Sequence, residues 1–189
     1  MIHTVSVSVL FAAAALFSSA FSAPVLKRAN PCFVTGSVTL PAEVSDGLAA
    51  LEAAPVTCNA AAQVAPGVPD VTSGGITYST IDFQKSALSP VGFSLRVSNG
   101  DLTTLQNQLN DYLALEAGVR SQPNSSALLA KLKGPKFFLQ FQIARVNTAN
   151  GVQLDAADTV DHQLTKVLAN AVGATSGEIA QVNALATQV

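Results

Sequence analysis

Histidine is scarce in this sequence of 189 residues, which contains only His3 and His162. A Ser-His-Asp or Cys-His catalytic centre uses a histidine as its base, and no G-x-S-x-G motif offers a serine on a sharp turn. The sequence therefore gives little support to nucleophilic hydrolysis. Asp158 stands four residues before His162. We interpret this spacing as a charged face of the last long helix, with an Asp-His site as the alternative.

Residues that build cofactor and sugar sites are also few. Tryptophan is absent and tyrosine occurs twice, so there are few aromatic rings on which a sugar could stack. Two cysteines and no Glu-x-x-His motif provide neither a zinc site nor a di-iron centre. No glycine-rich loop leads out of a candidate strand to hold a phosphate group. We expect no metal and no cofactor.

Charged residues make up only 12% of the chain, and the formal net charge is −2. A mildly acidic protein has no electrostatic reason to bind nucleic acid. The basic residues are scattered, apart from Lys131, Lys133 and Lys136. We interpret these three lysines as a solvated turn around Gly134-Pro135.

A hydrophobic run occurs at the N-terminus. Residues 1–22 are uncharged and apolar and end in small residues, which is typical of a secretory signal peptide. The small-x-small arrangement of Ala20 and Ser22 places the cut after Ser22. The run is short for a membrane span, no second one follows, and the C-terminus lacks the tail of a GPI signal. We therefore expect a secreted, extracellular protein without a membrane anchor.

Residues 23–28 end in Lys27-Arg28, an adjacent basic pair. We predict that they form a short propeptide removed after Arg28. Residues 29–189 then form a single secreted domain, which is long enough to bury a hydrophobic core.

Cys32 and Cys58 are the only cysteines, and in a secreted chain we expect them to form one disulfide bond. The bond would stabilise the fold by about 3 kcal/mol on the chain-entropy estimate. A single bond excludes cysteine-dense scaffolds such as hydrophobins, so the core must hold the domain together. Asn124, in the sequence Asn-Ser-Ser, is the only sequon and a candidate glycosylation site.

The clearest helical period lies in residues 101–120, where apolar residues recur every three or four positions. This pattern predicts an amphipathic core helix with Asp101 as its N-cap and a polar far side in water, formed by Thr103, Gln106, Asn107, Gln108 and Asn110. Glu116 continues the apolar stripe. We expect it to reach water or Arg120, and the alternative is a buried carboxylate with a raised pKa that marks a site.

Weaker patterns predict the other elements. Helices are expected at 42–54 and 155–171, with a helical turn at 127–132 and a frayed tail. Residues 90–99 and 136–149 suit either a helix or a strand, and their Pro openings and Asn-Gly endings favour helix. Residues 33–40 and 76–83 are expected to be paired strands, with an irregular loop at 59–75.

The predicted fold is mainly α, a single compact domain of about five helices with a short β element near the N-terminus. The alternative is an α+β fold with three or four antiparallel strands. Phe137, Phe138 and Phe141 are expected in its core.

The leader, the basic pair, the two cysteines and the stretches VPDVTSGG, LQNQLNDYLALEAGVRS and PKFFLQFQIARV resemble, over the full length, the loosely defined small secreted proteins of filamentous fungi. In this resemblance Lys27-Arg28 looks like the site of a kexin-type protease. The resemblance implies secretion but carries no activity and no catalytic residue.

We therefore expect a non-enzymatic extracellular protein that acts at the cell wall, at a surface or at a host interface. One alternative is a carrier of a small apolar ligand, which the apolar helices, the phenylalanines and the single disulfide suggest. Another is a hydrolase of unknown substrate that uses Glu116, or His162 with Asp158.

Overall fold

The structure, a computed structural model, describes residues 31–54, 56–81 and 101–188. The predicted signal peptide, the propeptide with Lys27 and Arg28, and the expected helix at 90–99 lie outside these residues. The described elements follow in the order α1, β1, β2, β3, a short 3-10 helix η1, and then α2 to α5. They form a single compact, mainly α domain with one small antiparallel sheet near the N-terminus, as the sequence predicts.

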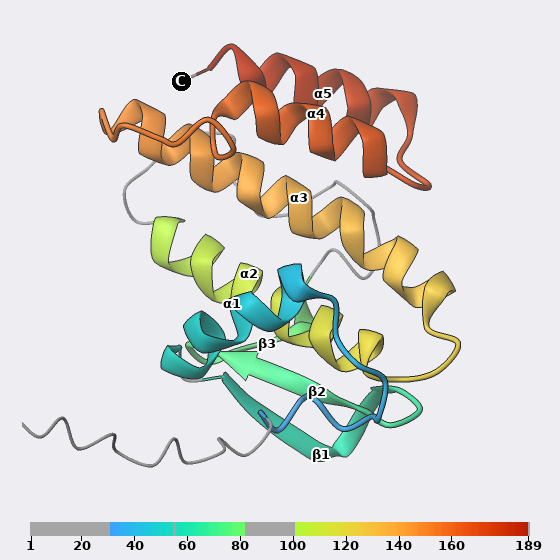
Figure 1. The fold of residues 1–189 in the computed structure, drawn as a ribbon. Coiled ribbons are helices and arrows are strands. Elements are labelled where there is room, and N and C mark those ends of the chain that lie inside the picture. Colours follow the sequence, from blue (N-terminus) through green and yellow to red (C-terminus); the bar gives the residue numbers. More distant parts are fainter. Residues whose placement is uncertain (1–30, 55, 82–100, 189) are drawn as a thin grey trace, which may run out of the picture.

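The helix α2 (Asp101–Arg120) lies in the middle of the molecule (Figure 1). On one side it packs against the sheet through β2 (Val68–Ser73), and α1 (Ala42–Ala53) contacts it as well. On the other side it packs against α3 (Ser126–Ala149). The helices α4 (Val160–Asn170) and α5 (Ser176–Ala186) lie beyond α3 (Figure 1).

Because α2 is covered on both sides, it is less amphipathic than its sequence predicts. Leu105, Leu109 and Tyr112 are buried, as expected. The prediction that the far side faces water is wrong for Asn110, which is buried, and Asn107 and Gln108 are half-buried. The apolar residues of α2 correctly predict a buried face. They do not reveal that polar residues such as Asn110 are buried as well.

The predicted loop at 59–75 is wrong, because most of it forms a β-hairpin. Strand β1 (Val56–Ala65) pairs antiparallel with β2 through Pro66-Gly67, and Gly67 has a φ of +74°, which glycine adopts without strain. The middle of β1 is rich in alanine, and its β-branched residues, Val56, Thr57 and Val64, lie towards its ends, so its composition is a weak signal for a strand. The predicted strand at 76–83 is confirmed only for β3 (Ile76–Thr77), which pairs with β2 and leads into η1 (Tyr78–Thr80).

The predicted strand at 33–40 is also wrong, because this segment lies along the end of α2. The backbone N–H of Val38 donates to the carbonyl of Ser121 at 2.9 Å, and that of Gly36 donates to the Ser121 hydroxyl at 3.0 Å. A Cβ atom at Gly36 would lie 1.9 Å from the Ser121 carbonyl oxygen, so only glycine allows this approach. The backbone N–H groups of Gly36 and Val38 therefore donate to Ser121 at the end of α2 and not to a neighbouring strand.

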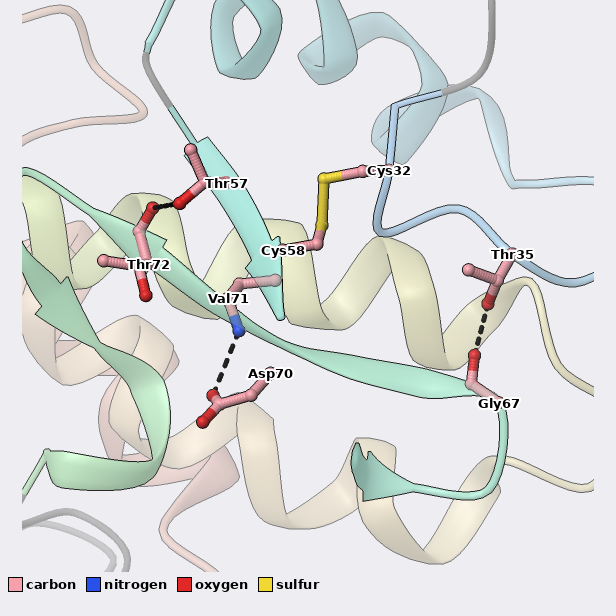
Figure 2. The surroundings of a disulfide bond; sticks show 8 residues. All are labelled: Cys32, Thr35, Thr57, Cys58, Gly67, Asp70, Val71 and Thr72. Carbon is pink, nitrogen blue, oxygen red and sulfur yellow. Dashed lines mark hydrogen bonds between the residues drawn. A yellow bond between two sulfur atoms is a disulfide. The ribbon is translucent and has the colours of Figure 1, made fainter. Parts of the chain in front are cut away.

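The disulfide between Cys32 and Cys58 is present and joins this segment to β1 (Figure 2). The same figure shows a hydrogen bond from the Thr35 hydroxyl to the Gly67 carbonyl at the hairpin turn. The N-terminal segment is thus fixed to the sheet covalently at one point and by a hydrogen bond at another.

The helix α3 is continuous through residues 127–132 and 136–149, which the sequence predicts as two separate elements. Pro135 does not open a helix, as predicted, but lies buried inside one. A proline inside a helix costs about 3 kcal/mol, which packing between α2 and α4 has to outweigh. The choice of helix for 136–149 is confirmed. Phe138 and Phe141 are in the core as expected, while Phe137 is half-buried.

The C-terminal part is more ordered than its sequence indicates. Helix α4 begins at Val160, later than predicted, because Thr159 caps it. The tail expected to fray forms α5, which starts with a capping box between Thr175 and Glu178. Arg145 in α3 donates to the Gln188 carbonyl at 2.7 Å and holds the end of the tail. In the part of the chain that the structure describes, no helix has the length and apolar character to cross a membrane.

Candidate functional site

Glu116 is the candidate residue that the structure places in the most distinctive setting. It lies in the last turn but one of α2 with an exposed fraction of only 4%. One carboxylate oxygen accepts hydrogen bonds from Nε and Nη2 of Arg120 at 3.0 and 2.9 Å, and the other accepts from Nζ of Lys136 at 2.6 Å. The expected contact with Arg120 is therefore present, but the carboxylate is buried and a residue of α3 shares it.

The charge of Glu116 results from two opposing effects. Burial raises the pKa of a carboxyl group, but the charges and hydrogen bonds of Lys136 and Arg120 outweigh burial and hold the pKa of Glu116 below its usual range. The group is ionised at neutral pH. Glu43 of α1 adds an exposed carboxylate 3.5 Å from Nη2 of Arg120.

Glu43, Glu116 and Lys136 border a cleft of about 440 Å³ between α1, α2, α3 and α4. Val44, Leu51, Leu113 and the ring of Phe137 form its apolar surface. Its polar groups include Glu43, Glu116, Lys136 and Lys166. The ammonium groups of Lys136 and Lys166 lie 4.6 and 5.7 Å from the centroid of the Phe137 ring, within reach of a cation–π interaction.

The predicted lysine turn is wrong, because Gly134-Pro135 is buried inside α3. Lys131 is exposed and Lys133 is half-buried, while Lys136 takes part in the ion pair with Glu116. Only one of the three lysines therefore belongs to the cleft.

The remaining predicted candidates lie away from this cleft. His162 is exposed in the first turn of α4, and Asp158 is exposed in the turn before that helix. The interpretation of the two as one helical face is therefore wrong. Asn124 is exposed in the turn between α2 and α3, with a φ of 60°. Its side chain is open to an enzyme that would attach a glycan.

A second buried carboxylate on α2, Asp111, is not among the residues that the sequence predicts for a site. Asp111 is completely buried, and neither of its carboxylate oxygens has a hydrogen-bond partner among the described residues. Asp70 of β2 is buried as well, and its Oδ1 accepts the N–H of Val71 at 3.0 Å and that of Ser79 at 3.3 Å. We call Asp70 and Asp111 the acid pair.

Burial raises the pKa of Asp111 to about 8, and the charge of Asp70 contributes to the shift. The backbone amide of Ser73, which lies outside hydrogen-bond geometry, offsets only a part of it. Tyr78 and Tyr112 pack edge to face beside the pair, with ring centroids 5.1 Å apart. The pKa of Tyr112 is raised, first by burial and then by Tyr78 and Asp111. Asp111 is therefore protonated at neutral pH, in a setting without a described cleft.

Only a weak signal in the sequence pointed to the acid pair. Asp111 precedes Leu115 by one helical turn, which places it on an apolar face of α2. Asp70 lies in the segment that was predicted to be an irregular loop. The pairing of Asp70 with Asp111 depends on the β-hairpin, which the sequence does not predict.

Residues 34–189 match the model of a protein family described as a domain of unknown function, DUF7143. The chain belongs to this family. The match to DUF7143 includes every residue of the Glu116 cleft and of the acid pair, and one of the two cysteines of the disulfide. Neither the comparison with curated proteins nor the comparison with solved structures gave a match. Membership of DUF7143 therefore assigns no activity, and the function has to be argued from the residues of this chain.

Proposed function

We propose that this protein is secreted and acts outside the cell by binding a small ligand in the Glu116 cleft, without catalysis. The cleft carries the proposal. Its volume of about 440 Å³ is within the range of small-molecule sites, which combine a mainly apolar lining with a few fixed polar groups. The cleft is open to solvent, so this is binding at the surface and not in a cavity sealed within the core.

The state of Glu116 supports binding in preference to hydrolysis. A general acid at neutral pH needs a raised pKa, and a general base needs a free carboxylate. Glu116 has a lowered pKa and both of its oxygens bonded to cations. His162 and Asp158 are exposed and lie outside the cleft. Hydrolysis by any of the three is thus the weaker proposal.

The disulfide supports the extracellular part of the proposal, because such bonds persist in oxidising compartments. Together with the leader and the basic pair it favours a fungal secreted protein with Lys27-Arg28 as its processing site. The exposed Asn124 is then a site that a glycan can occupy. We place the action of the protein at the cell wall, at a surface or at a host interface.

Secretion and processing are tested by expressing the full chain in a eukaryotic host and measuring the intact mass of the protein in the medium. We expect a chain that begins at Ala29, that lacks free thiols and that loses mass on treatment with an endoglycosidase. The loss should disappear in Asn124→Gln. A full-length chain retained in the cell would contradict this part of the proposal.

Ligand binding is tested by native mass spectrometry of the secreted protein after incubation with small-molecule extracts of the producing culture. Gly47 lines the cleft on α1, and a Cβ atom there would meet nothing within 4 Å, so Gly47→Leu should fold and obstruct the cleft. Ala49→Leu is the matched control, because Ala49 is exposed on the same helix and does not line the cleft.

We expect a bound small molecule in the wild type and in Ala49→Leu, and none in Gly47→Leu. Binding that is equal in the two variants would place the ligand elsewhere. Turnover of a substrate that Glu116→Gln abolishes would contradict a non-enzymatic role.

A further inference from the structure

The charges around the Glu116 cleft are unequally matched. Glu116 is satisfied by Arg120 and Lys136, and Glu43 lies within 3.5 Å of Arg120. Lys166 of α4 also lines the cleft, and no carboxylate pairs with it among the described residues. Its described contact is the face of the Phe137 ring. Three cationic groups thus face two carboxylates, which leaves one positive charge in excess.

That excess charge lies beside apolar surface. The ammonium groups of Lys136 and Lys166 both lie close to the ring of Phe137, at 4.6 and 5.7 Å from its centroid. Leu51, which is only 5% exposed, and the half-buried Val44 and Leu113 continue the surface from the ring towards α1 and α2. A ligand that complements this arrangement has one anionic group at Lys166 and an apolar chain over the three aliphatic side chains.

We propose that the cleft binds a small organic acid in its anionic form, with the carboxylate at Lys166 and Lys136 and the apolar chain along Phe137, Leu113 and Leu51. This inference rests on the proposed function, since it names the class of ligand for the same cleft. The ion pairs of Glu116 with Arg120 and Lys136 offset its repulsion of the incoming carboxylate.

Three probes share the same apolar chain and differ in the head group: octanoate, octan-1-ol and octylammonium. Comparing their affinities separates the contribution of the head group from that of the chain. Each is titrated into the isotopically labelled secreted protein, and binding is followed by the chemical shifts of the residues that line the cleft. We expect octanoate to bind about tenfold more tightly than octan-1-ol, which is the contribution of one charge-assisted hydrogen bond. Octylammonium should bind most weakly of the three.

The assignment of Lys166 is tested with Lys166→Gln and the matched control Lys131→Gln, since Lys131 is exposed on α3 and does not line the cleft. Lys166→Gln should weaken octanoate about tenfold and leave octan-1-ol unchanged. Lys131→Gln should change neither. Added salt should weaken octanoate more than octan-1-ol.

Equal binding of octanoate and octan-1-ol, both lost in Gly47→Leu, would overturn the anionic ligand while the cleft remained a binding site. Preference for octylammonium would overturn it as well. If no probe shifts the residues of the cleft, the inference is wrong, whereas the proposed function is then decided separately by the ligand that the wild type retains from extracts.

Discussion

Asp111 and Glu116 are two buried carboxyl groups on one helix, and their surroundings give them opposite charge states. Asp111 lies on the side of α2 that packs against the sheet, without a hydrogen-bond partner among the described residues and beside Asp70, and its pKa is raised to about 8. Glu116 lies next to α3 and the cleft, and Lys136 and Arg120 hold its pKa below the usual range. Burial acts in the same direction on both, so the neighbouring cations decide the difference.

The two groups also give opposite dependences of stability on pH. A raised pKa means that the folded state binds the proton more tightly, so the contribution of Asp111 is greatest below its unfolded pKa of 3.8 and declines as the pH rises towards about 8. The lowered pKa of Glu116 contributes stability that is present above its unfolded pKa of 4.5 and lost as the pH falls through the folded value. Asp111 and Glu116 together therefore favour a maximum of stability at mildly acidic pH.

Removing Lys136, a cationic partner of Glu116, should have the largest effect on stability. Lys136→Met leaves the buried carboxylate of Glu116 with the half-buried Arg120 as its remaining cationic partner, and breaking a buried pair in this way costs about 3 kcal/mol of unfolding free energy. Chemical denaturation at neutral pH measures the loss. The double variant Glu116→Gln with Lys136→Met should recover most of it, because no unpaired charge remains. A loss in Lys136→Met of less than about 1 kcal/mol would indicate an exposed, weak pair.

Preventing the ionisation of Asp111 should change stability in the opposite direction. Asp111→Asn keeps the shape but cannot ionise, so we expect it to stabilise the protein by at least about 2 kcal/mol at pH 8 and by little at pH 4. Denaturation curves at several pH values measure the difference. Asp46→Asn is the control, since Asp46 is exposed on α1 and should change stability by less than about 0.5 kcal/mol at either pH. A gain that is independent of pH would show that Asp111 does not titrate as described.

Glu43→Gln should have the smallest effect. Glu43 contacts the same Arg120 as Glu116 does, but its side chain is 74% exposed. An exposed ion pair contributes at most about 0.5 kcal/mol here, because water and salt screen it. Thermal denaturation should therefore hardly distinguish this variant from the wild type. A large loss would show that Glu43 is part of the buried cluster.

The comparison also shows which features of the fold can be predicted from sequence. The contact between Glu116 and Arg120 spans one helical turn, so the spacing indicates it, and the same local rules predict the helix at 101–120. The disulfide follows from there being only two cysteines. Lys136 reaches Glu116 from another helix, and no local pattern indicates which residue of α3 faces which residue of α2.

The wrong predictions for β1, for residues 33–40 and for Pro135 also result from contacts between residues far apart in the sequence. The alanine-rich β1 becomes a strand only because β2 lies beside it. Residues 33–40 have the composition of a strand, but their backbone donors bond to Ser121 at the end of α2. Pro135 would start or break an isolated helix, and burial keeps it inside α3. In each case a long-range contact overrides the local preference, and the acid pair depends on such contacts as well.

The central claim is that α2 has a ligand-binding side at Glu116 and a structural side at Asp111. Side-chain carboxyl NMR of the protein, titrated from about pH 3 to about pH 9 with and without octanoate, tests it most directly. We predict a midpoint near pH 8 for Asp111 and one below the usual range for Glu116, with octanoate shifting the Glu116 signal and leaving that of Asp111 in place. Ordinary midpoints for both groups, or an octanoate response at Asp111 alone, would contradict the claim.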